Sequence, residues 1–191
     1  MTLMKERKLL WQIRRTTCEG CQGEKFAFAV FVLINDSRER YPDMSIFGLH
    51  GESLGSATSV AVLEFRPRID FVVADCGFSE IINVMQGGLK NVHLPAWLVY
   101  PASLCTRLLY GYFYQQMRPI DSLKDNKIPI LFIHGEEDDF ILPWNSRVMR
   151  EATAGYSEIH LIPGAGHAES VLKAGEDYKK YVKEFLGAVC K

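Results

Sequence analysis

The stretch SIFGLHGESLGSAT at residues 45–58 decides the fold that this sequence predicts. Its first part, residues 45–49, is short and apolar, as a buried β-strand is, and the small side chains toward its end favour a helix. Between them, Gly51, Ser53 and Gly55 form the pattern Gly-x-Ser-x-Gly. A serine at a sharp strand-to-helix turn has a strained backbone, so the residues two positions away must have almost no side chain. The pattern therefore predicts a nucleophilic serine, Ser53.

Strands and helices alternate from this turn to the end of the chain. Residues 69–74 and 130–134 are apolar at consecutive positions, which is typical of strands covered on both faces, and residues 158–162 predict a further strand. Residues 178–189 place apolar side chains at helical spacing and lysines on the other side. This order predicts an α/β fold, with a mostly parallel sheet and helices on both of its faces.

Two segments depart from this alternation. Residues 81–126 contain no clear strand but several aromatic side chains, and we interpret them as a short helical lid over the carboxyl edge of the sheet. Residues 1–40 predict an atypical N-terminal segment, with one basic helix and an apolar run at 26–34. The core of the domain is then expected at residues 41–191.

A serine at its ordinary pKa needs a base, and the base needs a carboxylate to orient it. His167 follows the strand at 158–162 in a glycine-rich loop, and we expect it to be the base. Acidic residues follow the strand at 130–134, and Asp138 is the expected acid, with Asp139 as its nearest competitor and Glu137 as a weaker one. Because the carboxyl ends of parallel strands share one edge of a sheet, these side chains are expected to meet there.

Other polar groups near these strands have simpler interpretations. The Leu54 N–H lies at the start of a helix, where it can stabilise a developing oxyanion. His50 and His134 stand at strand ends beside glycine, and we expect them to be packed or hydrogen-bonded rather than catalytic.

Four stretches resemble the α/β-hydrolase superfamily, in particular its bacterial serine esterases related to dienelactone hydrolase and its peptidase-like members. They are HGESLGSAT at 50–58, RIDFVVADCGFS at 68–79, PILFIHGEEDDFILP at 129–143 and GAGHAES at 164–170. The resemblance covers residues 41–191 and implies that Ser53 is the nucleophile, Asp138 the acid and His167 the base, with no metal or organic cofactor. It implies a serine hydrolase that cleaves a carboxylic ester through an acyl-enzyme, with a small amide or a thioester as the alternative bond.

The chain departs from the family pattern before the nucleophile. The family normally has about 100 residues there, including a loop that supplies a second oxyanion N–H. Here only residues 1–52 precede Ser53, and they show no glycine-rich turn after a strand. We therefore expect N-terminal strands that are reduced or absent, as if that half of the domain were missing or replaced. The rival interpretation is a truncated, catalytically impaired hydrolase fragment, or a binding or subunit-forming module.

The composition of the chain argues against several other classes of function. The 191 residues carry 22 Lys+Arg and 23 Asp+Glu, a net charge of −1 that argues against general nucleic-acid binding. The apolar run at 26–34 is far shorter than the roughly 20 residues that span a bilayer. Five scattered cysteines indicate reduced thiols and a cytoplasmic protein. Cys18 and Cys21 have the spacing of half a zinc site, but no second pair follows, so no metal site is expected. The expected partners are a small-molecule ester as substrate and a second copy of the chain in a possible homo-oligomer.

Overall fold

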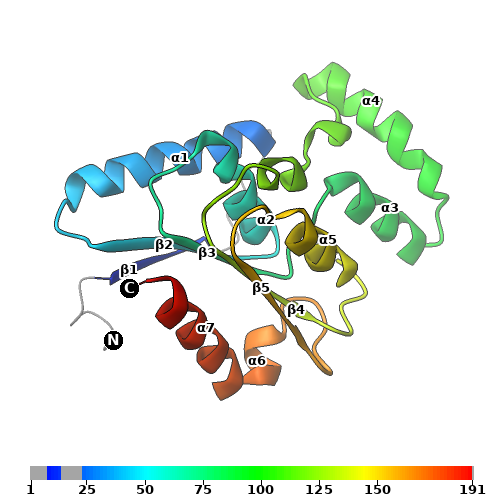
Figure 1. Cartoon of the computed structure of the whole chain (residues 1–191). Coiled ribbons are helices and arrows are strands. Elements are labelled where there is room, and N and C mark those ends of the chain that lie inside the picture. The colour runs from blue at the N-terminus through cyan, green and yellow to red at the C-terminus, as the bar shows by residue number, and fades with distance from the viewer. Residues whose placement is uncertain (1–7, 14–22, 191) are drawn as a thin grey trace.

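The computed structural model describes residues 8–13 and 23–190, and they form one parallel sheet with helices on both faces (Figure 1). Five strands are hydrogen-bonded in the order of the sequence. The strands are β1 (Lys8–Ile13), β2 (Ile46–Glu52), β3 (Phe71–Asp75), β4 (Ile130–Gly135) and β5 (Ser157–Ile162). All four neighbouring pairs are parallel, so the predicted α/β fold is confirmed.

Helices cover the two faces of the sheet unequally (Figure 1). On one face lie α1 (Gly23–Arg40), α2 (Leu54–Ala61), which continues as the short helix η1 (Val62–Phe65), and α5 (Trp144–Ala152). The other face carries α6 (Ser170–Ala174) and α7 (Glu176–Val189). Within the described part of the chain, no helix is long and apolar enough to cross a membrane.

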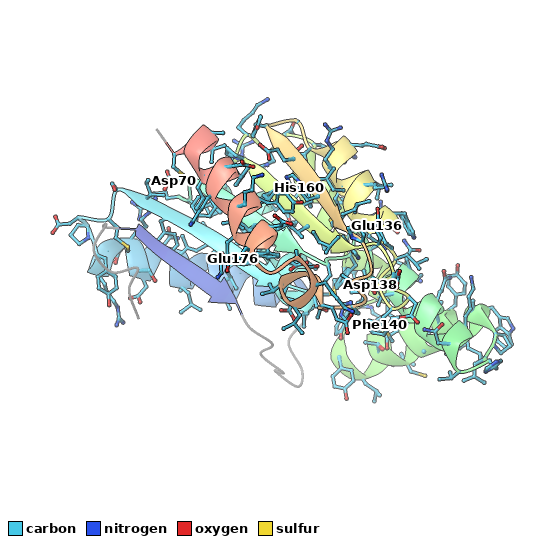
Figure 2. All side chains as sticks on the ribbon, turned by 90° about the horizontal axis from the view of Figure 1, so that it is seen from below. Asp70, Glu136, Asp138, Phe140, His160 and Glu176 are labelled. Carbon is cyan, nitrogen blue, oxygen red and sulfur yellow. The ribbon has the colours of Figure 1, made fainter. Side chains whose placement is uncertain are left out.

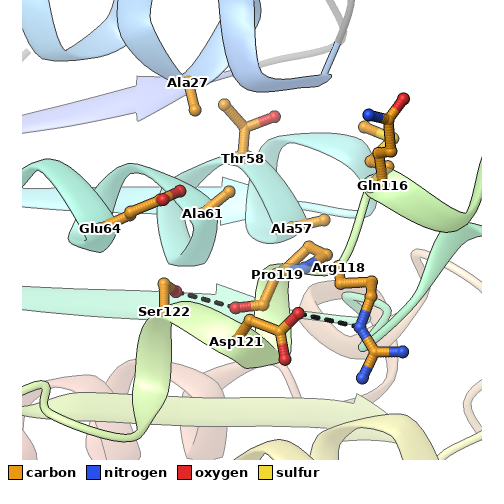
Figure 3. Close-up of a pocket in the computed structure, with 11 residues that line it drawn as sticks. Ala27, Ala57, Thr58, Ala61, Glu64, Gln116, Arg118, Pro119, Asp121 and Ser122 are labelled. Atoms are coloured by element: carbon orange, nitrogen blue, oxygen red, sulfur yellow. Dashed lines mark hydrogen bonds and ion pairs between the residues drawn. The ribbon is translucent and has the colours of Figure 1, made fainter. Parts of the chain in front are cut away.

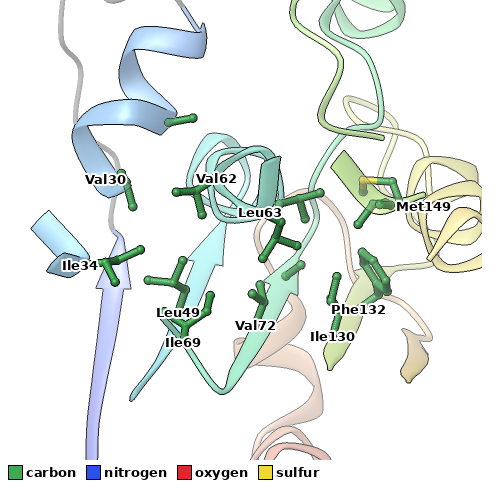
Figure 4. Close-up of a cluster of buried hydrophobic side chains, with 14 of the residues drawn as sticks. Val30, Ile34, Leu49, Val62, Leu63, Ile69, Val72, Ile130, Phe132 and Met149 are labelled. Carbon is green, nitrogen blue, oxygen red and sulfur yellow. The ribbon is translucent and has the colours of Figure 1, made fainter. Parts of the chain in front are cut away.

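The core consists of two main clusters, because successive residues of a strand point to opposite faces. Figure 4 shows the larger cluster, in which side chains of β2, β3 and β4 pack against α1, α2, η1 and α5. Its members include Val30, Ile34, Leu49, Val62, Leu63, Val72, Phe132 and Met149. The second cluster joins the alternate strand residues, Val73, Leu131 and Ile133 among them, to Tyr178 and Phe185 of α7.

The segment at 81–126 is helical, as the sequence predicts. It contains α3 (Ile81–Asn91), η2 (Ala96–Leu98), α4 (Val99–Tyr110), η3 (Tyr114–Gln116) and η4 (Pro119–Leu123). Figure 1 shows α3 and α4 extending to the side of the sheet, beyond α5. That the segment at 81–126 acts as a lid stays a prediction.

The N-terminal region is more regular than the sequence predicts. β1 pairs with β2 from Lys8↔Ile46 to Ile13↔Gly51, and α1 packs its buried residues onto α2 and η1. The weak signal has a physical reason: α1 is apolar on its solvent side as well, with Phe28, Val32 and Leu33 about half exposed, so it lacks amphipathic spacing.

Candidate active site

Ser53 occupies the turn between β2 and α2. Its backbone angles are φ 54° and ψ −116°, a left-handed conformation that is strained for any residue except glycine. The Ser53 N–H donates a hydrogen bond to the backbone oxygen of Asp75, at 2.9 Å. A Cβ on Gly51 would lie 2.2 Å from the Gly55 oxygen, so the close turn needs a glycine there. The structure thus has the strand–turn–helix geometry that the glycine–serine pattern predicts.

Ser53, His167 and Asp138 form a continuous hydrogen-bonded chain. Ser53 Oγ lies 3.0 Å from His167 Nε2, and His167 Nδ1 lies 2.8 Å from Asp138 Oδ2. An ionised carboxylate only accepts hydrogen bonds, so Nδ1 carries the ring proton and Nε2 is free to accept the Ser53 proton. The three side chains come from loops after β2, β4 and β5, which end at the same edge of the sheet. This is the arrangement that activates a serine as a nucleophile.

The structure distinguishes Asp138 from its neighbours as the partner of His167. Asp138 is 2% exposed, whereas Asp139 and Glu137 are exposed to solvent. Burial alone would raise the pKa of Asp138, but hydrogen bonds from His134, His167 and the Ile141 N–H outweigh it and hold the pKa well below its usual value. Asp138 is therefore ionised at neutral pH.

His134 supports Asp138 from the neighbouring strand. It is completely buried, and its Nε2 donates to the Ile141 oxygen at 2.7 Å and lies 3.2 Å from Asp138 Oδ2. Its Nδ1 then accepts a hydrogen bond from Ser146 Oγ, at 2.7 Å. The sequence indicates a hydrogen-bonded histidine here, but its contact with the acid emerges only in the structure.

Cys76 lies against the same side chains and has no role in the sequence-based account. Its sulfur, an Asp138 oxygen and a His167 nitrogen are all within 4.8 Å of one another, a grouping that could in principle hold a metal ion. Burial and the charge of Asp75 raise the pKa of the Cys76 thiol well above its usual value, and Asp138 and His167 are already bonded to each other. Cys76 is thus a buried thiol beside this hydrogen-bonded pair. The Cys18–Cys21 pair lies outside the described residues.

The rim of the site is apolar. Phe140 is 46% exposed and its ring meets the His167 ring edge to face, with 5.0 Å between the ring centres. Leu54 is also exposed, and its N–H belongs to the first turn of α2, where amides have no partner within the helix. Figure 2 shows Asp138 and Phe140 on the side of the molecule where α3 and α4 lie.

Two cavities of the described residues lie away from these side chains. The first, about 200 Å³, is bordered by α1, α2 and the segment from η3 to η4, and includes Thr58, Arg118 and Asp121 (Figure 3). The second, about 590 Å³, lies between η1 and the residues before β4. Neither is lined by Ser53, Asp138 or His167.

Known proteins share this sequence pattern and this fold. The prolyl oligopeptidase family matches residues 27–190. The uncharacterized protein YqkD of Bacillus subtilis is 30% identical over 190 residues, which cover 93% of this chain and 61% of YqkD. An esterase of Pyrococcus furiosus has the same fold with a TM-score of 0.67 at 19% identity, over 88% of this chain and 63% of the esterase. The acylaminoacyl peptidase of Pyrococcus horikoshii gives 0.63 at 17% identity, over 87% of this chain and 28% of the peptidase. The chain thus spans about three fifths of the length of its Bacillus relative.

Proposed function

Because the chain belongs to the prolyl oligopeptidase family, within the α/β-hydrolase superfamily, we propose that it is a serine hydrolase that cleaves carboxylic esters. One observation carries the proposal: the unbroken hydrogen-bonded chain from Ser53 Oγ through His167 to the buried Asp138 carboxylate. The geometry lets the base accept the serine proton on one ring nitrogen while the carboxylate accepts the hydrogen of the other.

In the proposed reaction, Ser53 Oγ attacks the acyl carbon while its proton passes to His167 Nε2. Asp138 keeps the Nδ1–H in place and stabilises the imidazolium that forms. The Leu54 N–H and the N-terminus of α2 stabilise the oxyanion. His167 then protonates the leaving alcohol, and as a base again it activates the water that releases the acyl group from Ser53.

The apolar rim supports an acyl or alcohol group of modest size as the substrate. Phe140 stands directly beside the base and Leu54 directly after the nucleophile, and both are partly exposed. We propose that α3 and α4 act as a lid over this edge of the sheet, on the side where Figure 2 places Phe140. A small amide or a thioester remains the alternative substrate, in line with the acylaminoacyl peptidase among the proteins of the same fold.

Hydrolysis of p-nitrophenyl acetate and butyrate tests the proposal. The wild-type protein should hydrolyse both esters, and Ser53→Ala and His167→Ala should each reduce the rate to background. Ser157→Ala and His93→Asn are matched controls, because Ser157 begins β5, at the opposite edge of the sheet from Ser53, and His93 is an exposed residue in the turn after α3; asparagine also tolerates the left-handed backbone of His93. A folded wild-type protein without activity, or a Ser53→Ala variant with wild-type activity, would contradict the proposal and favour a binding or subunit-forming module.

The proposal also covers the cellular compartment and the oligomeric state of the protein. We propose a cytoplasmic enzyme, since Cys76 and Cys105 are free thiols in the described part of the chain. We also propose a homo-oligomer, because β1 and β5 are the outer strands of the described sheet and outer strands can pair with another chain. Light scattering of the purified protein gives the oligomeric state directly.

A further inference from the structure

A buried polar network contacts the Ser53 turn and the loop that follows His167, and it takes no part in the proton transfers described above. Its centre is Asp75, at the carboxyl end of β3 and 2% exposed. The other members come from three further elements: His50 of β2, Ser170 of α6 and Tyr178 of α7. Ser170 and Tyr178 are also buried, so each polar atom depends on the network for its partners.

The hydrogen bonds of the network have defined directions. Ser170 Oγ donates to Asp75 Oδ1 at 2.8 Å, and the Tyr178 hydroxyl donates to Asp75 Oδ2 at 3.1 Å. Since Tyr178 gives its only hydroxyl proton to Asp75, it must accept from His50 Nε2, which lies 2.8 Å away. With Asp75 ionised, Ser170 Oγ, the Tyr178 hydroxyl and His50 Nε2 each donate one hydrogen bond within the network.

Asp75 connects the nucleophile to the base. Its backbone oxygen accepts the Ser53 N–H at 2.9 Å, and its side chain holds Ser170, three residues after His167. Ser53 has φ 54° and Ala168, next to His167, has φ 61°, and such conformations persist only where neighbouring contacts enforce them. Asp75 thus restrains both strained turns, the one at Ser53 and the one at Ala168 next to His167, and Ser53 and His167 are joined by the 3.0 Å hydrogen bond.

We propose that Asp75 is a positioning residue of the hydrolase: its carboxylate, through Ser170 and Tyr178, holds the His167 loop at hydrogen-bonding distance from Ser53. This inference rests on the proposed function. Among the described residues, the Asp75 side chain bonds Ser170 and Tyr178 rather than Ser53 Oγ or the His167 ring, so its effect is on the geometry of the Ser53–His167 pair. A displacement of a catalytic group by about 1 Å can reduce a rate by about 100-fold, so such a restraint has a measurable effect.

The network also makes the positioning dependent on pH. Burial raises the pKa of Asp75 to about 6, and burial lowers the pKa of His50 to about 4. Below about pH 6, Asp75 gains a proton, one of its oxygens becomes a donor, and Ser170 or Tyr178 loses its acceptor. The groups that act on Asp75 from the packed elements are Glu52 of β2, His134 of β4, Ser170 of α6 and Tyr178 of α7. We therefore expect the His167 loop to loosen in acid.

The rate at which a fluorophosphonate labels Ser53, measured between pH 5 and pH 9, tests the proposal. At pH 8, Ser170→Ala and Asp75→Asn should slow labelling about tenfold, the equivalent of one lost hydrogen bond, and Ser170→Thr should restore most of the rate. In ester hydrolysis the loss should appear in kcat with KM unchanged, because the substrate contacts stay in place. Relative to its value at pH 8, the wild-type rate should fall below pH 6 more steeply than the rate of Asp75→Asn, which lacks the titrating carboxylate.

Matched variants separate positioning from a general loss of stability. Tyr181→Phe removes a hydroxyl from the same helix as Tyr178, on a ring that stacks on His160. Ser122→Ala removes a hydroxyl that is bonded to backbone oxygens beside the cavity of Figure 3. Both should label at the wild-type rate. If Ser170→Ala and Asp75→Asn also label at the wild-type rate across the pH range, the proposal is overturned.

Nuclear magnetic resonance of labelled histidines distinguishes failure of this proposal from failure of the proposed function. If the folded wild-type protein is not labelled at all, the hydrolase proposal fails, but the His167 ring can still be observed. Its resonances should change in Ser170→Ala and stay unchanged in Ser122→Ala. Unchanged His167 resonances in both variants would contradict a positioning role for Asp75, whether or not the protein is an enzyme.

Discussion

His134 approaches the same oxygen of Asp138 that holds His167. His134 Nε2 lies 3.2 Å from Asp138 Oδ2, and His167 Nδ1 lies 2.8 Å from that atom. The other oxygen, Oδ1, accepts the N–H groups of Phe140 and Ile141 at 3.0 and 2.8 Å. Both oxygens of the carboxylate thus have partners, and these partners fix its orientation toward His167.

Asp138→Asn should almost abolish ester hydrolysis. An amide at this position can donate to His167 Nδ1 and so favours the wrong tautomer, and in a comparable triad this change reduces kcat by about 10⁴-fold. Asp139→Asn is the matched control, since Asp139 is exposed, and should stay within about twofold of wild type. Initial rates with p-nitrophenyl acetate measure both. Equal losses in the two variants would mean that the acid is misassigned.

His134→Gln should destabilise the fold and weaken catalysis less than Asp138→Asn does. The change disturbs a fully buried group with partners in Ile141, Ser146 and Asp138, and a lost buried hydrogen bond costs about 1–3 kcal/mol. Urea unfolding measures the stability. Ser146→Ala serves as a control, because it removes one partner of His134 without touching Asp138, and it should leave the rate close to wild type. A His134→Gln variant with unchanged stability and rate would show that His134 does not support the acid.

Gly51→Ala should prevent the nucleophile turn from closing. Its Cβ would lie 2.2 Å from the Gly55 oxygen, a backbone atom that cannot move without displacing α2. We expect loss of activity together with a lower melting temperature. Gly88→Ala in α3 is the matched control, because nothing lies within 4 Å of the added carbon, and it should stabilise the helix by about 0.5–1 kcal/mol. Full activity in Gly51→Ala would contradict the geometry of the turn.

Ionisation of Asp75 should lower the stability of the fold between pH 4 and pH 7. Burial raises its pKa from the ordinary 3.8 to about 6, so in this range the native state holds more protons than the unfolded state. The contribution of Asp75 to the free energy of unfolding therefore falls as the pH rises, by about 3 kcal/mol in all. His50, with its pKa lowered to about 4, acts in the opposite direction as the pH falls below its ordinary 6.5.

The comparison of wild type with Asp75→Asn isolates the Asp75 contribution, since His50 is present in both. Urea unfolding at several pH values should show the wild-type advantage shrinking from pH 4 to pH 7. Parallel stability curves for the two proteins would contradict the raised pKa. In the proposed scheme, the ionised form that costs stability is also the form that pairs both Ser170 and Tyr178.

Local sequence signals were enough to predict the central part of the fold and the three side chains Ser53, Asp138 and His167 of the candidate site. The turn at Ser53 is indicated by the glycines two positions before and after it, and Asp138 and His167 each follow an apolar strand within a few residues. In contrast, α1 is apolar around much of its circumference and shows no clear helical spacing. The Asp75 network could not be predicted, because Ser170 and Tyr178 are 95 and 103 residues away in the chain. Hydrogen bonds over such separations leave no pattern in a single sequence.

The site of covalent labelling tests the central claim most directly. The folded protein should be treated with a fluorophosphonate at pH 8, and the modified peptide identified by mass spectrometry. The account predicts one adduct, on Ser53, that is absent from His167→Ala and present in His93→Asn. A folded protein with no adduct, or with its adduct on another serine, would contradict the assignment of Ser53 as the nucleophile.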